Sequence, residues 1–268
     1  MAVARVRVVS TAQAIGDELA MRLLSAIELA RNEGHRFLLG CPTGRTPRPI
    51  YDAMGAKLAK RRQDISNVVL VMMDEYVVAE ESGFRYADSH NPWSCHHFAR
   101  VEILQRWNEA LPQSRQLPAG SLWFPDPKHP AEYDKRIAEA GGVDFFLLAS
   151  GASDGHVAFN PPGSSRDSGT RIIELSAETR NDNLKTFPDF GTLEAVPKHG
   201  VSVGLGTIAS AREAVMVVWG AAKRMTLRRI REAKGHEADW PATIIHECRN
   251  AVVLCDKDAA AANEGDPA

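Results

Sequence analysis

Short apolar runs alternate with longer amphipathic segments along most of the chain. The apolar runs predict strands at residues 6–9, 37–39, 68–73, 143–148, 201–203, 215–218 and 251–255. Helical spacing of apolar residues predicts helices at residues 11–32, 47–60, 130–140 and 221–233. In the first of these, Ile15, Leu19, Leu23 and Ile27 recur every four residues and form one apolar stripe. The pattern therefore indicates a chain in which strands and helices take turns.

Two of the predicted strands are apolar almost throughout, with Asp144 as the one polar residue. Residues 68–73 and 143–148 show no polar alternation, which is typical of strands covered on both faces. Because strands that alternate with helices favour parallel pairing, we predict an α/β fold with an open, mostly parallel sheet and helices on both faces. No internal repeat or linker divides the chain, so residues 1–256 are expected to form a single domain. Residues 257–268 are rich in alanine and polar residues and are expected to be a disordered tail.

Length, net charge and composition argue against several classes of protein. The length of 268 residues suits a single α/β domain, and the formal net charge of -2 argues against nucleic acid or an anionic membrane as the main partner. No apolar run approaches the ~20 residues that span a bilayer, and the N-terminus lacks the apolar core of a secretory signal. The scattered cysteines are typical of reduced thiols. We therefore expect a cytoplasmic protein, and composition leaves monomer and homo-oligomer equally open.

Polar residues follow three of the apolar strands, at residues 41–46, 74–76 and 150–156. In open α/β sheets, ligands bind outside the carboxyl ends of the strands. We therefore expect these three loops to converge on one crevice, although they are far apart in the sequence.

The first of the three loops has the features of an anion site. It runs from a predicted strand into a predicted helix, and a helix N-terminus offers unpaired N–H groups to an anion. Gly44 lets the backbone approach closely, while Thr43 and Thr46 add hydroxyl donors. A plain tight turn with Thr46 as the helix cap is the alternative. The loop matches neither a Walker motif nor a G-x-G-x-x-G fingerprint.

The second loop places Asp74 and Glu75 directly after a buried strand. Successive side chains on an extended chain point in opposite directions, so we expect one carboxylate to enter the crevice. That carboxylate is a candidate general base. The alternative is that one acid caps the next element while the other is solvated.

The third loop carries Asp154-Gly155-His156 at the end of an apolar strand. A histidine titrates near neutrality and can donate or accept a proton. Asp154, two residues away, can orient the ring. The adjacent His96 and His97 are interpreted as structural or rim residues. Because no acid–histidine set has a convincing metal-ligand spacing, we expect no metal.

Taken together, these motifs resemble those of the glucosamine-6-phosphate deaminase family. Residues 42–47 read P-T-G-R-T-P, where the family usually has P-T-G-G-T-P or P-T-G-S-T-P. Residues 73–77 read M-D-E-Y-V, as in the family, and residues 154–160 read D-G-H-V-A-F-N against its D-G-H-I-A-F-N. Further matches continue in order to about residue 256. The resemblance implies a Rossmann-like α/β fold and a phosphorylated amino sugar as substrate.

The family reaction converts glucosamine 6-phosphate and water to fructose 6-phosphate and ammonia. By resemblance, Asp74 is the base that moves a proton between two sugar carbons, and His156, oriented by Asp154, opens the ring. The resemblance places the phosphate on a loop that here consists of Thr43, Gly44, Arg45 and Thr46, together with Lys223, while Lys185 takes the place of a phosphate-binding arginine in a mobile lid. No metal or cofactor is implied.

This chain departs from the family pattern at several positions. Pro161 stands where family deaminases carry a Glu that supports the ring-opening histidine, and Arg45 replaces a small loop residue. Lys185 lacks the bidentate fork of an arginine. Asp167 or Glu174 is a candidate to replace the missing Glu. Three other readings stay open: a 6-phosphogluconolactonase, an isomerase or deaminase of another sugar phosphate, and a non-catalytic sugar-phosphate sensor.

Overall fold

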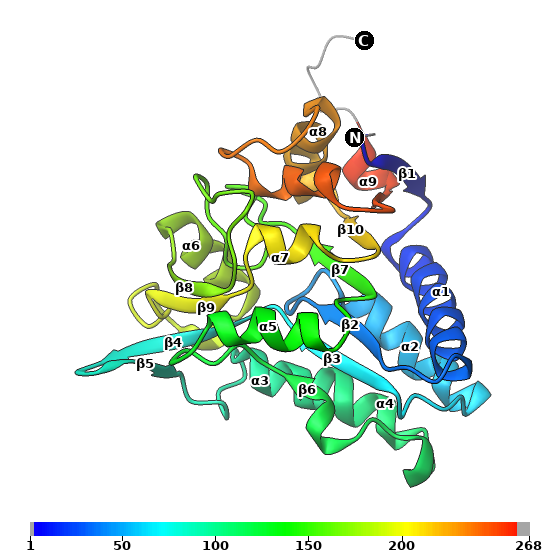
Figure 1. The fold of residues 1–268 in the computed structure, drawn as a ribbon. Helices are drawn as coiled ribbons and strands as arrows, with labels where there is room; N and C mark the ends of the chain where they lie inside the picture. Colours follow the sequence, from blue (N-terminus) through cyan, green and yellow to red (C-terminus); the bar gives the residue numbers. More distant parts are fainter. Residues whose placement is uncertain (1–2, 262–268) are drawn as a thin grey trace.

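The computed structural model describes residues 3–261, and its centre is a parallel sheet (Figure 1). Within these residues, seven strands pair in the order β1-β11-β10-β7-β2-β3-β6, and every neighbouring pair is parallel. This confirms the predicted fold class. The strands are β1 Arg5–Val9, β2 Phe37–Cys41, β3 Val68–Met72, β6 Leu122–Trp123, β7 Phe145–Ala149, β10 Ala214–Val218 and β11 Val252–Asp256.

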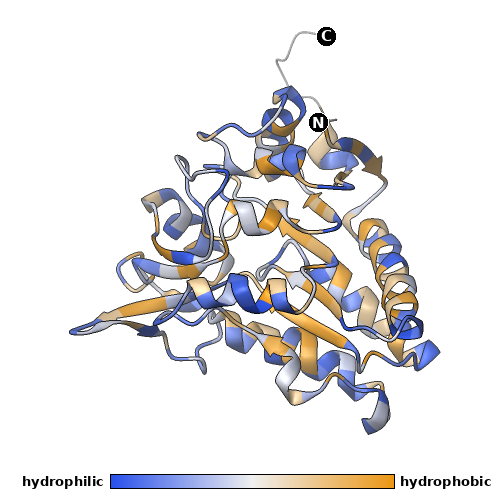
Figure 2. Cartoon of the chain, viewed as in Figure 1, coloured by the Kyte–Doolittle hydropathy of each residue, from blue (hydrophilic) through white to orange (hydrophobic). Residues whose placement is uncertain are grey.

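Helices cover both faces of this sheet, and each face has its own hydrophobic core. Alternate residues of one strand enter opposite cores, as Leu39 and Leu38 of β2 do. The central strands are accordingly apolar along their length (Figure 2). One face packs against α1 Ala12–Asn32, α2 Arg48–Arg61 and the run α3 Cys95–Phe98, π-helical Ala99–Gln105 and α4 Arg106–Glu109. The other packs against α5 Ala131–Glu139, α7 Leu205–Ala209, α8 Arg224–Glu232 and the 3-10 segment Pro241–Glu247.

The contact between α1 and α2 sets the position of the loop that precedes α2. Thr11 caps α1 by accepting a hydrogen bond of 3.1 Å from the Ala14 amide. Gly16, one turn later, faces the start of α2: a Cβ at this position would lie 2.3 Å from the Pro49 carbonyl oxygen. Only glycine allows this close approach, so the sequence of α1 helps to fix the N-terminus of α2.

A second sheet lies beside the first and was not predicted. It has the order β5-β4-β9-β8, and its neighbouring strands are antiparallel: β4 Asp74–Glu80, β5 Gly83–Tyr86, β8 Arg171–Glu174 and β9 His199–Ser202. Two expectations were therefore wrong. Residues 74–76 begin a strand instead of forming a loop, because Asp74 pairs with Ser202. The strand predicted at 201–203 belongs to this sheet and not to the parallel one.

The remaining elements surround the sheet edges and the chain end. The helix α6, Ala177–Thr186, follows β8, and further 3-10 turns lie at Gln113–Arg115, Ala119–Ser121, Pro188–Phe190 and Ala221–Lys223. The start of the expected disordered tail is helical instead. The helix α9, Lys257–Ala260, is capped by Asp256, which accepts a hydrogen bond of 2.8 Å from the Ala259 amide. Residues 262–268 of that expected tail lie outside the described residues.

No helix within residues 3–261 is both long enough and apolar enough to span a membrane.

Candidate active site

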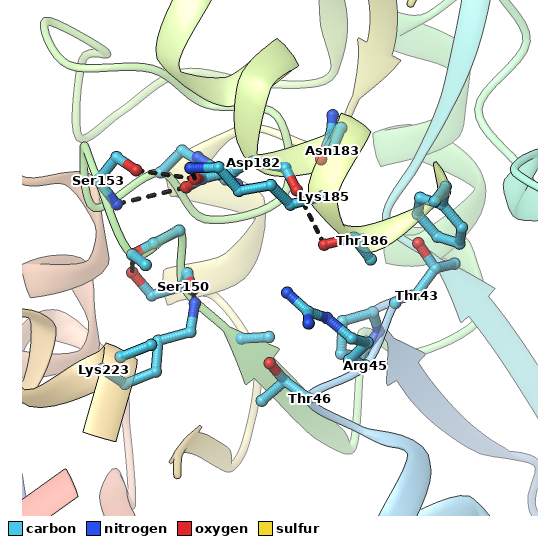
Figure 3. Close-up of a pocket in the computed structure, with 18 of the residues that line it drawn as sticks. Thr43, Arg45, Thr46, Ser150, Ser153, Asp182, Asn183, Lys185, Thr186 and Lys223 are labelled. Atoms are coloured by element: carbon cyan, nitrogen blue, oxygen red, sulfur yellow. Dashed lines mark hydrogen bonds and ion pairs between the residues drawn. The ribbon is translucent and has the colours of Figure 1, made fainter. Parts of the chain in front are cut away.

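A cavity of about 420 Å³ lies at the carboxyl ends of β2, β7 and β10, where the helix α6 and the strand β4 meet the parallel sheet (Figure 3). This is the edge at which the three predicted loops were expected to converge. The side chains or backbone of all but one of the sequence-predicted site residues line it: Thr43, Gly44, Arg45, Thr46, Asp74, His156, Lys185 and Lys223. The exception, Asp154, lies behind His156.

The loop at residues 42–46 is held from two sides. Tyr51 Oη donates a hydrogen bond of 2.8 Å to the Pro42 carbonyl, and Trp219 Nε1 donates one of 2.9 Å to the Thr46 carbonyl. Gly44 has a φ of +87°, a conformation that disfavours residues with a side chain. The alternative of Thr46 as helix cap was wrong, since Pro47 occupies the cap position of α2. The loop is thus a rigid cradle at the beginning of a helix.

Three cationic side chains reach the cavity from three different elements (Figure 3). Arg45 comes from the loop, Lys185 from α6 and Lys223 from the 3-10 turn after β10. Lys223 Nζ donates a hydrogen bond to the Ser150 carbonyl. Burial lowers the pKa of Lys223 to about 8. Lys185 is 70% exposed and lies 3.7 Å from Asp182 Oδ1. The cavity therefore offers a strongly cationic end to an anion.

Asp74 is the carboxylate of β4 that enters the cavity. Burial raises its pKa to about 7, with a further upward contribution from Glu75. A hydrogen bond of 3.4 Å from Cys95 Sγ and the charge of His156 oppose this rise. A carboxyl group poised near neutrality can both accept and return a proton, which is the property of a general base.

Glu75 points to the opposite side of β4 and is also fully buried. Its carboxylate accepts hydrogen bonds of 2.8 Å from Ser94 Oγ and from the His96 amide, and one of 2.6 Å from His96 Nδ1. It therefore holds the N-terminus of α3, as the capping alternative proposed, although neither acid is solvated. The His96 ring also stacks on Phe124, with 3.6 Å between ring centroids, in keeping with its structural interpretation.

Asp154 and His156 form a hydrogen-bonded pair. His156 Nδ1 lies 2.6 Å from Asp154 Oδ1, so Nε2 is the nitrogen left for a substrate. Although burial raises the pKa of Asp154, the hydrogen bond from His156 and its charge hold that pKa well below its usual range. Gly151 is required beside the ring, because a Cβ there would lie 2.3 Å from His156 Nδ1. The pair is thus packed in one orientation.

The helix α6 contributes residues that sequence reasoning missed. Thr179 Oγ1 donates a hydrogen bond of 2.8 Å to Asp154 Oδ2, and Asp182 accepts one of 2.8 Å from Ser153 Oγ. Asp182 also lines the cavity, with Ser153, Asn183, Thr186, Phe187 and Trp219. A signal was present in the sequence: Thr179, Asp182 and Lys185 recur every third residue, so on a helix each lies next to the following one.

The two acids proposed as replacements for the missing Glu were wrong choices. Asp167 and Glu174 are exposed and lie outside the cavity wall, as does Pro161. Instead, Asp154, His156 and Asp182 have oxygen and nitrogen atoms within 4.8 Å of one another. This is also the one group within residues 3–261 whose spacing suits a metal ion. Since His156 Nδ1 already bonds Asp154, the arrangement is equally that of a histidine with two carboxylates nearby.

A family profile and curated relatives both match this chain over most of its length. A family profile described as "Glucosamine-6-phosphate isomerases/6-phosphogluconolactonase" matches residues 10–254. A glucosamine-6-phosphate deaminase of Shouchella clausii is 32% identical over 245 residues, which cover 91% of this chain and 93% of that protein. One from Dictyostelium discoideum is 33% identical over 226 residues, which cover 84% of this chain and 79% of that protein.

Solved structures share the fold. That of a monomeric glucosamine-6-phosphate deaminase has a TM-score of 0.80 at 24% identity, covering 96% of this chain and 98% of that chain. A 6-phosphogluconolactonase from Trypanosoma cruzi has a TM-score of 0.68 at 17% identity and covers 97% of each chain. With a profile match over most of its length and relatives above 30% identity, the chain belongs to the glucosamine-6-phosphate isomerase/6-phosphogluconolactonase family.

Proposed function

We propose that this protein is a glucosamine-6-phosphate deaminase, which converts glucosamine 6-phosphate and water to fructose 6-phosphate and ammonia. The observation that carries the proposal is that Asp74 and His156 line one cavity with a cationic loop at a helix N-terminus. An acid–base pair beside an anion site suits a phosphorylated sugar whose carbon skeleton undergoes proton transfer. Relatives at 32–33% identity carry the same name.

Ring opening is the first step and is assigned to His156. The ring oxygen gains a proton, the hydroxyl on C1 loses one, and the bond between C1 and the ring oxygen breaks to leave an open-chain aldehyde. A histidine can perform both transfers because it holds and releases a proton near neutral pH. Asp154, hydrogen-bonded to Nδ1, keeps Nε2 directed into the cavity.

Proton transfer between carbons is the second step and is assigned to Asp74. The carboxylate takes the proton from C2, the electrons of that bond form a C1–C2 double bond, and O1 gains a proton from the ammonium group of the substrate. Asp74 then returns its proton to C1, which leaves a C2–nitrogen double bond. Water adds to C2, and ammonia leaves with the formation of the ketone. A carboxyl group with its pKa raised to about 7 suits both directions of transfer.

Substrate binding is assigned to the cationic end of the cavity. The phosphate would lie on Thr43, Gly44, Arg45 and Thr46 at the start of α2, with Lys223 as its main side-chain cation. Lys185 would add a second, more exposed charge from α6. Arg45 offers a guanidinium fork, which Lys185 cannot provide.

A substrate panel tests the proposal against its alternatives. Glucosamine 6-phosphate is expected to yield ammonia and fructose 6-phosphate in equal amounts. Acid release from 6-phosphogluconolactone, without ammonia from the amino sugar, would identify a lactonase instead. Ketose formed from a neutral aldose phosphate would identify an isomerase. Binding of these phosphates without turnover of any would identify a sensor.

A further inference from the structure

One face of α6 is a polar stripe that contacts the loop carrying His156. Ser176 Oγ and Thr179 Oγ1 donate hydrogen bonds of 3.2 Å and 2.8 Å to Asp154 Oδ2. One turn further, Asp182 accepts hydrogen bonds from Ser153, of 2.8 Å from Oγ and 3.3 Å from the amide. The helix is thus joined to Asp154 and to the residue before it, and the proposed mechanism leaves the carboxylate of Asp182 without a role.

Asp182 lies where its carboxylate can act, beside that of Asp154, as a second negative charge near the His156 ring. Its side chain is 16% exposed, and one of its oxygens lies within 4.8 Å of both a His156 ring nitrogen and an Asp154 oxygen. Ser153 engages both carboxylate oxygens, which fixes the direction of the group. Pro161, which follows the D-G-H-V-A-F-N motif, has no carboxylate and lies outside the cavity wall.

We propose that Asp182 is a positioning residue for ring opening, which supplies His156 with the second carboxylate that residue 161 lacks. A histidine that moves protons becomes positively charged during the reaction, and a carboxylate nearby stabilises that charged form. The assignment rests on the proposed function, because ring opening is the step in which His156 acts.

Other charges share this environment. Asp74 faces His156 from β4, whereas Lys185 and Lys223 lie near Asp182 from α6 and from the turn after β10. Lys185 is mostly exposed and is also assigned to the phosphate, so substrate binding draws this cation away from Asp182. When the substrate is bound, the charge of Asp182 is therefore less neutralised by Lys185, and its carboxylate stabilises the charged form of His156 more strongly.

Asp182→Asn is the test variant, because it removes the charge while keeping an oxygen acceptor for Ser153 Oγ. Asp182→Glu restores the charge. Glu178→Gln is the matched control, because it removes a carboxylate from an exposed position on the same helix. Two rates are measured with glucosamine 6-phosphate. Ammonia release gives kcat and KM, and exchange between the α and β anomers, followed by NMR, reports ring opening without deamination.

Asp182→Asn is expected to lower kcat and anomer exchange about tenfold, less than the loss of a whole acid–base group. KM should change less than twofold, Asp182→Glu should recover much of the rate, and Glu178→Gln should match the wild type. Anomer exchange in Asp182→Asn at the wild-type rate overturns the inference, as does an equal loss in the control. If the wild-type protein exchanges anomers but releases no ammonia, the proposed deaminase activity is refuted. The rate of anomer exchange in the Asp182 variants then still decides the role of Asp182. A wild type that does neither refutes both.

Discussion

The hydroxyl of Thr179 donates a hydrogen bond of 2.8 Å to Asp154 Oδ2, and this contact joins the helix α6 to the loop that carries His156. Thr179 is the one residue of α6 that is buried. The orientation of the Asp154–His156 pair therefore depends on a helix that has little apolar surface holding it in place. Small changes in this contact should therefore change the rate of the step that is assigned to His156.

Thr179→Val is expected to lower kcat about fivefold to tenfold. Valine has a similar shape but cannot donate to Asp154, and a hydrogen bond to a charged group contributes about 1.5–3 kcal/mol. Steady-state ammonia release measures the rate, and thermal unfolding measures the loss of stability.

Thr207→Val is the matched control, because Thr207 Oγ1 donates a bond of 2.7 Å to Asp134 outside the cavity. It should reduce stability by a comparable amount and leave kcat unchanged. If both variants lost activity equally, the effect of Thr179 would be one of global stability.

Asp74→Asn is expected to abolish deamination while leaving sugar-phosphate binding within a few-fold of the wild type. The amide cannot take the proton from C2, whereas the phosphate contacts lie on other elements. Exchange of the C2 proton with deuterated solvent is the direct measurement. Exchange at the wild-type rate in the variant would show that Asp74 is not the base.

The pH dependence of kcat/KM should be bell-shaped, with its maximum between about pH 7 and about pH 8. Asp74 acts as a base only when ionised, so activity rises as pH increases through its pKa of about 7. Lys223 binds phosphate only when protonated, so activity falls as pH increases through its pKa of about 8. Lys223→Arg keeps the charge at high pH and should extend the alkaline side. An unchanged alkaline limb in this variant would assign that limb to another group.

Lys223→Ala is expected to weaken binding of phosphorylated sugars by about one to two orders of magnitude, because a charge-assisted contact contributes about 1.5–3 kcal/mol. Binding of the unphosphorylated sugar should change little. Calorimetric titration with both ligands gives the comparison. Lys135→Ala, which removes an exposed charge on α5, should affect neither ligand. Equal weakening of both ligands by Lys223→Ala would place Lys223 away from the phosphate.

The sequence by itself determined the elements whose signals are local. The stripe of Ile15, Leu19, Leu23 and Ile27 predicted a helix that the structure has at Ala12–Asn32. The apolar runs predicted the buried strands β3 and β7 because a strand covered on both faces has no polar positions. Loops after such strands meet at one edge of a parallel sheet, and residues from two of these loops, Thr43 to Thr46 and His156, do line the cavity.

Tertiary structure decided what depends on contacts between distant segments. Alternation along β4 predicted that one of Asp74 and Glu75 enters the cavity, but the pairing of Asp74 with Ser202 and the hydrogen bonds of Glu75 to the start of α3 determine which one. The helix α6 has almost no apolar stripe, so periodicity did not reveal it. Asp182 became a candidate only when folding brought it within 4.8 Å of Asp154 and His156, because a polar spacing along a helix does not show which distant residues the helix contacts.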